Sequence, residues 1–137
     1  MNWKIIFAAG LMLLMSGVLI GFVGGGHTSQ SKHTAMAWYA GDLVAHFLLY
    51  SATFAWVAYR QPRHLVVHAA LAVLVAFILA TASLAVVGTI LPLPPTDRPL
   101  ILQAIDWAVT AISAVVGLSL GHHQAKKARA AHAHDDA

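Results

Sequence analysis

The chain alternates between long apolar runs and short polar breaks, and this alternation predicts four helices. Each apolar run is close to the roughly 20 residues that a helix needs to cross the ~30 Å hydrocarbon core of a bilayer. The four runs cover residues 5–23, 36–59, 65–91 and 100–120. We therefore predict an all-α fold, an integral membrane bundle of four spanning helices.

The breaks between the runs contain the residues that end helices. Three consecutive glycines, residues 24–26, follow the first run, and Pro62 lies between the second and the third. Proline recurs four times in residues 92–99, ahead of the fourth run. Because proline lacks the amide N–H that a helix interior requires, these segments are expected to be short connections.

The predicted domain organisation is simple. Residues 1–121 form one four-span transmembrane domain, and residues 122–137 form a cytoplasmic tail rich in histidine and lysine that extends the fourth helix and then frays in water. The first run resembles a secretory signal peptide because Lys4 precedes it. It is longer than the usual apolar region of about 7–15 residues, and no Ala-x-Ala site follows it, so we interpret it as a retained helix.

Composition excludes a soluble or disordered chain. Of 137 residues, 59% are hydrophobic and only 9% are charged, whereas a soluble domain carries about 25% charged residues. A chain of this size cannot bury so much apolar surface in its own core, and disordered chains are poor in apolar residues. There is no cysteine, so disulfides and thiolate sites are excluded. The basic residues lie in short clusters between apolar runs, so we expect no nucleic-acid partner.

The distribution of lysine and arginine predicts the orientation of the helices. Six of these residues fall on one side of a four-span path and two on the other. The six are Lys4, Arg60, Arg63, Lys126, Lys127 and Arg129, and the two are Lys32 and Arg98. Because cytoplasmic loops carry the excess of positive residues, both termini are predicted to be cytoplasmic. Trp38 and Tyr39 are interpreted as part of the outer aromatic belt.

The second run contains ionisable residues that hydrocarbon disfavours. Asp42, His46 and Tyr50 are spaced four and four, which places them along one helix face. A carboxylate one turn from an imidazole favours the charged form of each, so we expect Asp42 and His46 to form a hydrogen bond. The same three residues also fit a purely structural role, as a polar clamp between helices.

The fourth run carries a stripe of polar and small residues. Asp106, Thr110, Ser113 and Gly117 follow one another at steps of four, three and four. Lipid gives no reason for such a stripe, whereas a neighbouring helix does. Glycines four residues apart also allow close approach of helix backbones. The residues predicted to pack helices together are Gly17, Gly21, Ser113, Gly117 and Gly121.

The topology relates the two carboxylates to each other. The second and fourth runs both enter the membrane from the outside, so Asp42 and Asp106 are expected at similar depth. Arg98, just before the fourth run, is the nearest counter-ion, and His46 is the other. We predict a polar pocket that opens toward the extracytoplasmic leaflet, formed by Asp42, His46, Tyr50, Arg98, Asp106 and Thr110.

This spacing resembles the pattern of the VanZ-like family of small bacterial membrane proteins. That family has an Asp at the start of a span, a His four residues later and a Tyr after four more, as in Asp42, His46 and Tyr50. It also has an Arg before its last span and an Asp inside it, where this chain has Arg98 and Asp106. The resemblance covers about half of the chain.

The chain departs from the family pattern at several positions. Leu43 stands where the family has Lys, Thr110 replaces an Asn, and Ser113 replaces a Gly. An acidic residue that the family carries late in its third span is missing. The family is named for a protein linked to resistance to teicoplanin, a lipid-bearing glycopeptide antibiotic. The resemblance implies a cell-envelope role for a multi-pass protein of the bacterial cytoplasmic (inner) membrane, without supplying a reaction. Our leading hypothesis is that the polar pocket engages a membrane lipid head group or an envelope precursor.

Two other functions stay open. The first is a non-catalytic accessory subunit of a larger membrane complex, or a homo-oligomer, which the small size and the glycine faces favour. No phosphate loop, Ser-His-Asp arrangement or zinc motif appears, which also favours a non-enzymatic role. The second is a b-type haem-binding membrane subunit.

A haem requires two imidazoles at matching depth on facing helices. The candidate pairs are His46 with His27 or His33, and His68 with His122 or His123. His46 lies near the predicted outer leaflet and His68 near the inner one, so these two do not pair. We expect neither a cofactor nor a metal site.

Overall fold

The computed structural model describes residues 1–25, 32–61, 63–90 and 99–135. These residues form four helices, with no strand among them. The helices are α1 (Trp3–Gly25), α2 (Lys32–Arg60), α3 (Leu65–Ile90) and α4 (Leu100–Asp135). Each is long and apolar enough to cross a membrane. The prediction of an all-α, four-helix membrane protein is therefore confirmed, and the chain has the architecture of a multi-pass membrane protein.

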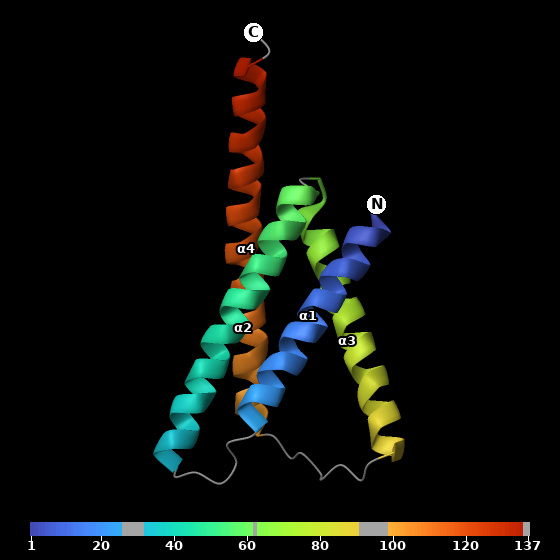
Figure 1. The fold of residues 1–137 in the computed structure, drawn as a ribbon, viewed down its shortest axis with the longest axis vertical. Coiled ribbons are helices and arrows are strands. Elements are labelled where there is room, and N and C mark those ends of the chain that lie inside the picture. The colour runs from blue at the N-terminus through green and yellow to red at the C-terminus, as the bar shows by residue number, and fades with distance from the viewer. Residues whose placement is uncertain (26–31, 62, 91–98, 136–137) are drawn as a thin grey trace.

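Consecutive helices run in opposite directions, and they lie closer together at one end of the bundle than at the other (Figure 1). Both termini and the α2–α3 connection lie at one end, which we call the narrow end because α1, α2 and α3 converge there. At the opposite end, which we call the wide end, α1 and α3 finish, α2 and α4 begin, and α2 and α3 diverge. The distribution of basic residues predicts that the narrow end is cytoplasmic.

The helices contact one another in the order α4, α2, α1, α3. The contact between α2 and α4 is the most extensive, followed by those of α1 with α3 and of α1 with α2. The α2–α3 contact is small, and in the described part of the chain α3 and α4 have no extended contact. The bundle is therefore asymmetric, with α1 and α2 in its middle.

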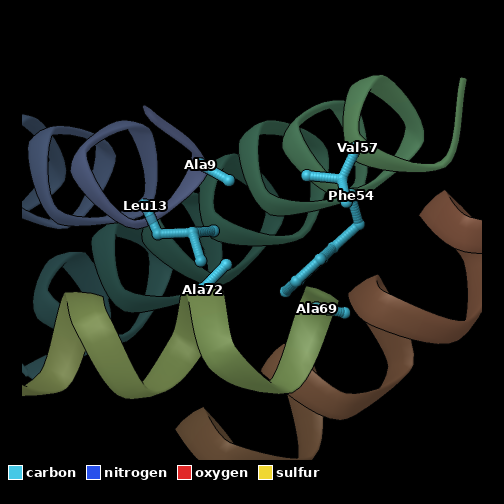
Figure 2. Close-up of a cluster of buried hydrophobic side chains, with 6 residues drawn as sticks. All are labelled: Ala9, Leu13, Phe54, Val57, Ala69 and Ala72. Atoms are coloured by element: carbon cyan, nitrogen blue, oxygen red, sulfur yellow. The ribbon is translucent and has the colours of Figure 1, made fainter. Parts of the chain in front are cut away.

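A buried cluster joins α1, α2 and α3 (Figure 2). Its members are Ala9, Leu13, Phe54, Val57, Ala69 and Ala72. Phe54 is fully buried, and its ring extends from α2 toward Ala69 of α3. Lipid tails are as apolar as these side chains, so association in a membrane depends on close van der Waals contact, which small residues such as Ala9 and Ala72 permit.

Two glycines of α4 allow it to lie directly against α2. A Cβ atom at Gly117 would clash with the carbonyl oxygen of Ser51 and would lie 2.7 Å from the Cβ of Phe54. A Cβ atom at Gly121 would likewise clash with the carbonyl oxygen of Ala55. Both obstacles include backbone atoms, which cannot rotate away as a flexible side chain would. Only glycine is compatible with this distance between the two helices.

Ser113 continues the same face of α4 one turn earlier. Its side chain is fully buried, and its hydroxyl donates to the carbonyl oxygen of Val109 at 2.7 Å. Because this hydrogen bond lies within α4, the hydroxyl is satisfied without a partner on another helix. The structure thus places Ser113, Gly117 and Gly121 on the face of α4 that meets α2.

Gly17 and Gly21 of α1 lack the close backbone contacts that Gly117 and Gly121 make. Nothing lies within 4 Å of a Cβ atom at Gly21, and at Gly17 the nearest atom is the hydroxyl oxygen of Tyr50 at an ordinary 3.5 Å. The close approach occurs instead at Gly10, where a Cβ atom would lie 2.6 Å from Cγ1 of Val75. Straight helices that cross at an angle are close only near the crossing point. In the described structure Gly21 therefore meets no neighbouring helix and Gly17 meets only the hydroxyl of Tyr50, so a packing role for these two glycines stays a prediction.

We predict that Gly121→Ala lowers the stability of the protein in detergent, whereas Gly21→Ala does not. The added methyl group at residue 121 must push α2 away, and such overpacking costs about 1–3 kcal/mol. At residue 21 the methyl group has free space, and alanine favours a helix by up to about 1 kcal/mol over glycine. Thermal unfolding of both variants tests this, and equal melting temperatures would contradict the close α2–α4 contact.

Candidate binding cavity

A cavity of about 610 Å³ lies in the half of the bundle next to the wide end, with residues of all four helices around it. Its polar lining comes mainly from α2 and α4, in the form of Tyr39, Asp42, His46, Tyr50, Asp106 and Thr110. Its apolar lining comes mainly from α1 and α3, including Leu13, Val18, Ile20, Phe77, Leu84 and Val87. The cavity therefore has one polar side and one apolar side.

The structure brings Asp42 and Asp106 to the same cavity from different helices. Both side chains are partly exposed. The close α2–α4 contact holds their helices together, and the hydroxyl of Tyr39 donates to Oδ1 of Asp106 at 3.5 Å. This bond joins α2 and α4 about one turn from Asp42, so the two carboxylates lie at a comparable level along the bundle.

Tyr39 is a lining residue that sequence reasoning assigned to another role. It was interpreted as part of the outer aromatic belt, whereas its hydroxyl contacts Asp106. Tyr39 lies three residues before Asp42, and residues three apart share a helix face. That spacing is the signal that could have placed it with Asp42, His46 and Tyr50.

The hydrogen bond between Asp42 and His46 differs from the expected one. Nδ1 of His46 donates to the main-chain carbonyl oxygen of Asp42 at 3.1 Å, not to its carboxylate. A helical side chain leans toward the N-terminus, so a short imidazole reaches the carbonyl oxygen one turn back more readily than a carboxylate. Because a carbonyl oxygen only accepts, Nδ1 carries the proton in this bond and Nε2 is left as the acceptor of the neutral ring.

Tyr50 closes the cavity toward the narrow end. Its ring meets the ring of His46 edge to face, with centroids 5.3 Å apart and planes at 80°. Its hydroxyl reaches α1, where it lies 3.5 Å from the position that a Cβ atom of Gly17 would take. Thr110 donates its hydroxyl to the carbonyl oxygen of Asp106 at 2.9 Å. The hydroxyl of Thr110 is thus satisfied within α4, at the side of the cavity.

The lining of the cavity, as far as the structure describes it, carries negative charge. Asp42 and Asp106 are its only acidic residues, and no lysine or arginine occurs among the described residues that line the cavity. The predicted counter-ion Arg98 lies outside the described residues. Carboxylates only accept hydrogen bonds, so a group that fits between them supplies donors or a positive charge.

The other histidines singled out by the haem hypothesis lie in different surroundings. His68 is 2% exposed, and its Nδ1 donates to the carbonyl oxygen of His64 at 2.9 Å. His122 and His123 are exposed on α4. His27 lies outside the described residues. Within the described chain, no three His, Cys, Asp or Glu residues gather as a metal site.

Comparison of the chain with protein-family models, curated proteins and solved structures finds no significant match. The family resemblance therefore rests on the residues alone, and function must be argued from the cavity.

We predict that a cysteine at residue 110 reacts with a small water-soluble thiosulfonate reagent at least about tenfold faster than a cysteine at residue 113, because thiol modification requires access. The two positions are matched. Both hydroxyls bond to their own helix, yet Thr110 lines the cavity and Ser113 is fully buried. The chain has no other cysteine.

The charge of the reagent provides the second comparison for the Thr110→Cys variant. Two carboxylates in a low-dielectric cavity attract cations, so an ammonium-bearing reagent should react faster than a sulfonate-bearing reagent of equal size. Equal rates for residues 110 and 113, or faster reaction with the sulfonate, would contradict the described cavity.

Proposed function

We propose that this protein binds an amphiphilic lipid or cell-envelope component in the cavity, as a VanZ-like protein of the bacterial cytoplasmic membrane. The observation that carries the proposal is the pair of carboxylates, Asp42 and Asp106, that line one cavity from separate helices. A single acidic residue at a helix face is explained by helix packing. Two that converge on an accessible space of this size, with apolar residues opposite, favour a ligand.

The polar side of the cavity suits a headgroup that bears an amine. Asp42 and Asp106 provide acceptor oxygens, and Nε2 of His46 provides another. A primary ammonium group has three donors and a positive charge, which these acceptors complement. Such charge-assisted hydrogen bonds are stronger than neutral ones. Tyr50 adds a phenol at the inner limit of the cavity.

The apolar side suits an acyl chain. Residues of α3 and α4 both line the cavity, although these helices have no extended contact within the described residues. An acyl chain can therefore reach the cavity sideways from the bilayer, between α3 and α4. Phe77, Leu84 and Val87 of α3 line the cavity and are exposed, so they can contact such a chain. The lateral path favours a ligand from the membrane over a water-soluble one.

The proposed activity is binding without a chemical step. Asp42 and Asp106 orient the cationic group of the ligand. The resemblance to a family linked to teicoplanin resistance suggests an envelope role for such binding. A protein that holds an amphiphile in the outer half of the membrane can change the access of a lipid-bearing antibiotic to its target.

We predict that Asp42→Asn and Asp106→Asn each lower photolabelling of the protein by phosphatidylethanolamine that carries a diazirine on its acyl chain. Loss of the charge removes one charge-assisted hydrogen bond, which contributes ~1.5–3 kcal/mol. Because about 1.4 kcal/mol is a factor of ten, labelling should fall by roughly tenfold or more. Diazirine-bearing phosphatidylglycerol, which lacks the amine, should only weakly label the residues that line the cavity of the wild-type protein. Asp135→Asn, the same substitution at the far end of α4, is the matched control and should keep full labelling.

The same four proteins give a cellular readout, which is the teicoplanin susceptibility of bacteria that express them at equal levels. The wild type and Asp135→Asn should raise resistance, and the two cavity variants should not. If all four proteins label and protect equally, the carboxylates have only a structural role. A large stoichiometric assembly on native purification, together with unchanged labelling, would instead favour the accessory-subunit hypothesis.

A further inference from the structure

The last part of α4 projects beyond the rest of the bundle at the narrow end (Figure 1). α4 has 36 residues, which at 1.5 Å per residue gives a length of about 54 Å. A span requires roughly 20 residues. The segment from about Gly121 onward therefore lies at or beyond the level of the lipid headgroups. This segment is a continuous helix to Asp135.

One face of this projecting segment is basic. His122, Lys126 and Arg129 are spaced four and three residues apart, so they share a face of α4. Together with Ala125 they line a hollow of about 240 Å³. No acidic residue is among the described residues that line the hollow. Three nitrogen-bearing side chains therefore border the hollow, with no carboxylate among the described residues that line it.

The hollow lies where α4 leaves the bundle. Gly121 is still in close contact with Ala55 of α2, and Ala125, one turn later, is only 5% exposed. An alanine on an isolated helix is far more exposed, so the bundle covers this side of α4 up to Ala125. The basic side chains themselves are exposed. This position corresponds to the headgroup layer of the leaflet at the narrow end.

We propose that His122, Lys126 and Arg129 bind the phosphate group of an anionic lipid headgroup. Arginine matches a phosphate with two parallel N–H donors, and lysine adds a point charge. The aliphatic stems of both residues can lie along apolar surface while their charged ends stay in the headgroup layer. The phosphate of a lipid is already held at this depth, whereas a free phosphate is not, so the lipid is the favoured source.

The site is separate from the cavity near the wide end, and the inference does not depend on the proposed function. It assigns α4 a second role, which is to fix the narrow end to anionic lipids. Lipid binding at this site also explains why His122, Lys126 and Arg129 lie on the side of Ala125, next to the bundle.

The test compares two double variants of the full-length protein with equal net charge. Lys126→Gln with Arg129→Gln removes both strong cations of the hollow. Lys4→Gln with Lys127→Gln removes two cations at the same end of the bundle from residues that do not line the hollow. All four side chains are exposed, so both variants are expected to fold, which far-ultraviolet circular dichroism and gel filtration check.

Each protein is reconstituted in phosphatidylcholine nanodiscs with increasing phosphatidylglycerol, and native mass spectrometry counts the phosphatidylglycerol that stays bound. The hollow variant should need about tenfold more phosphatidylglycerol than the wild type, and the matched variant should bind as the wild type does. Equal losses in both variants would overturn the proposal in favour of diffuse surface charge. Inorganic phosphate is added in a separate arm, and displacement of the lipid by millimolar phosphate would overturn the choice of a lipid.

Discussion

The position of α4 against α2 depends on the absence of side chains at Gly117 and Gly121. These residues let the two backbones approach until a Cβ atom on α4 would overlap a carbonyl oxygen of α2. Helices in a membrane associate through such close van der Waals contact because lipid competes equally well for apolar side chains. The α2–α4 contact is the most extensive in the bundle. It sets the relative level of the two helices that carry the carboxylates.

Most polar side chains near this contact are satisfied by their own helix. The hydroxyls of Thr53, Thr110 and Ser113 donate to carbonyl oxygens one turn back, and His46 donates to the carbonyl oxygen of Asp42. A carboxylate has no proton to donate and cannot be satisfied in this way. Asp42 and Asp106 therefore require donors from elsewhere, and Tyr39 supplies one of them to Asp106. This difference explains why the carboxylates, and not the hydroxyls, define the candidate site.

The sequence predicts the four helices and the shared cavity of Asp42 and Asp106, because length and hydropathy determine spans, and topology determines which helices start at the same end. It does not predict which glycines lie in contacts. Gly17 and Gly21 have the same spacing as Gly117 and Gly121, yet only the second pair lies directly against the backbone of a neighbouring helix. Spacing describes one helix, whereas a close contact depends on where two helices cross. Spacing places Tyr39 on the face of Asp42, but its hydrogen bond to Asp106 on α4 depends in the same way on how the two helices meet.

Chemical cross-linking across the cavity tests most directly whether Tyr39 of α2 and Asp106 of α4 lie at the same depth in the bundle. Cysteines at residues 39 and 106 should be joined by a short bifunctional thiosulfonate, whereas cysteines at residues 39 and 108 should not, because Ala108 is exposed and does not line the cavity. Trypsin cleavage at Arg60 or Arg63 separates α2 from α4, so cross-linked halves stay together on a non-reducing gel. Failure of the 39–106 pair to link, when both thiols react with a monofunctional reagent, would contradict the account.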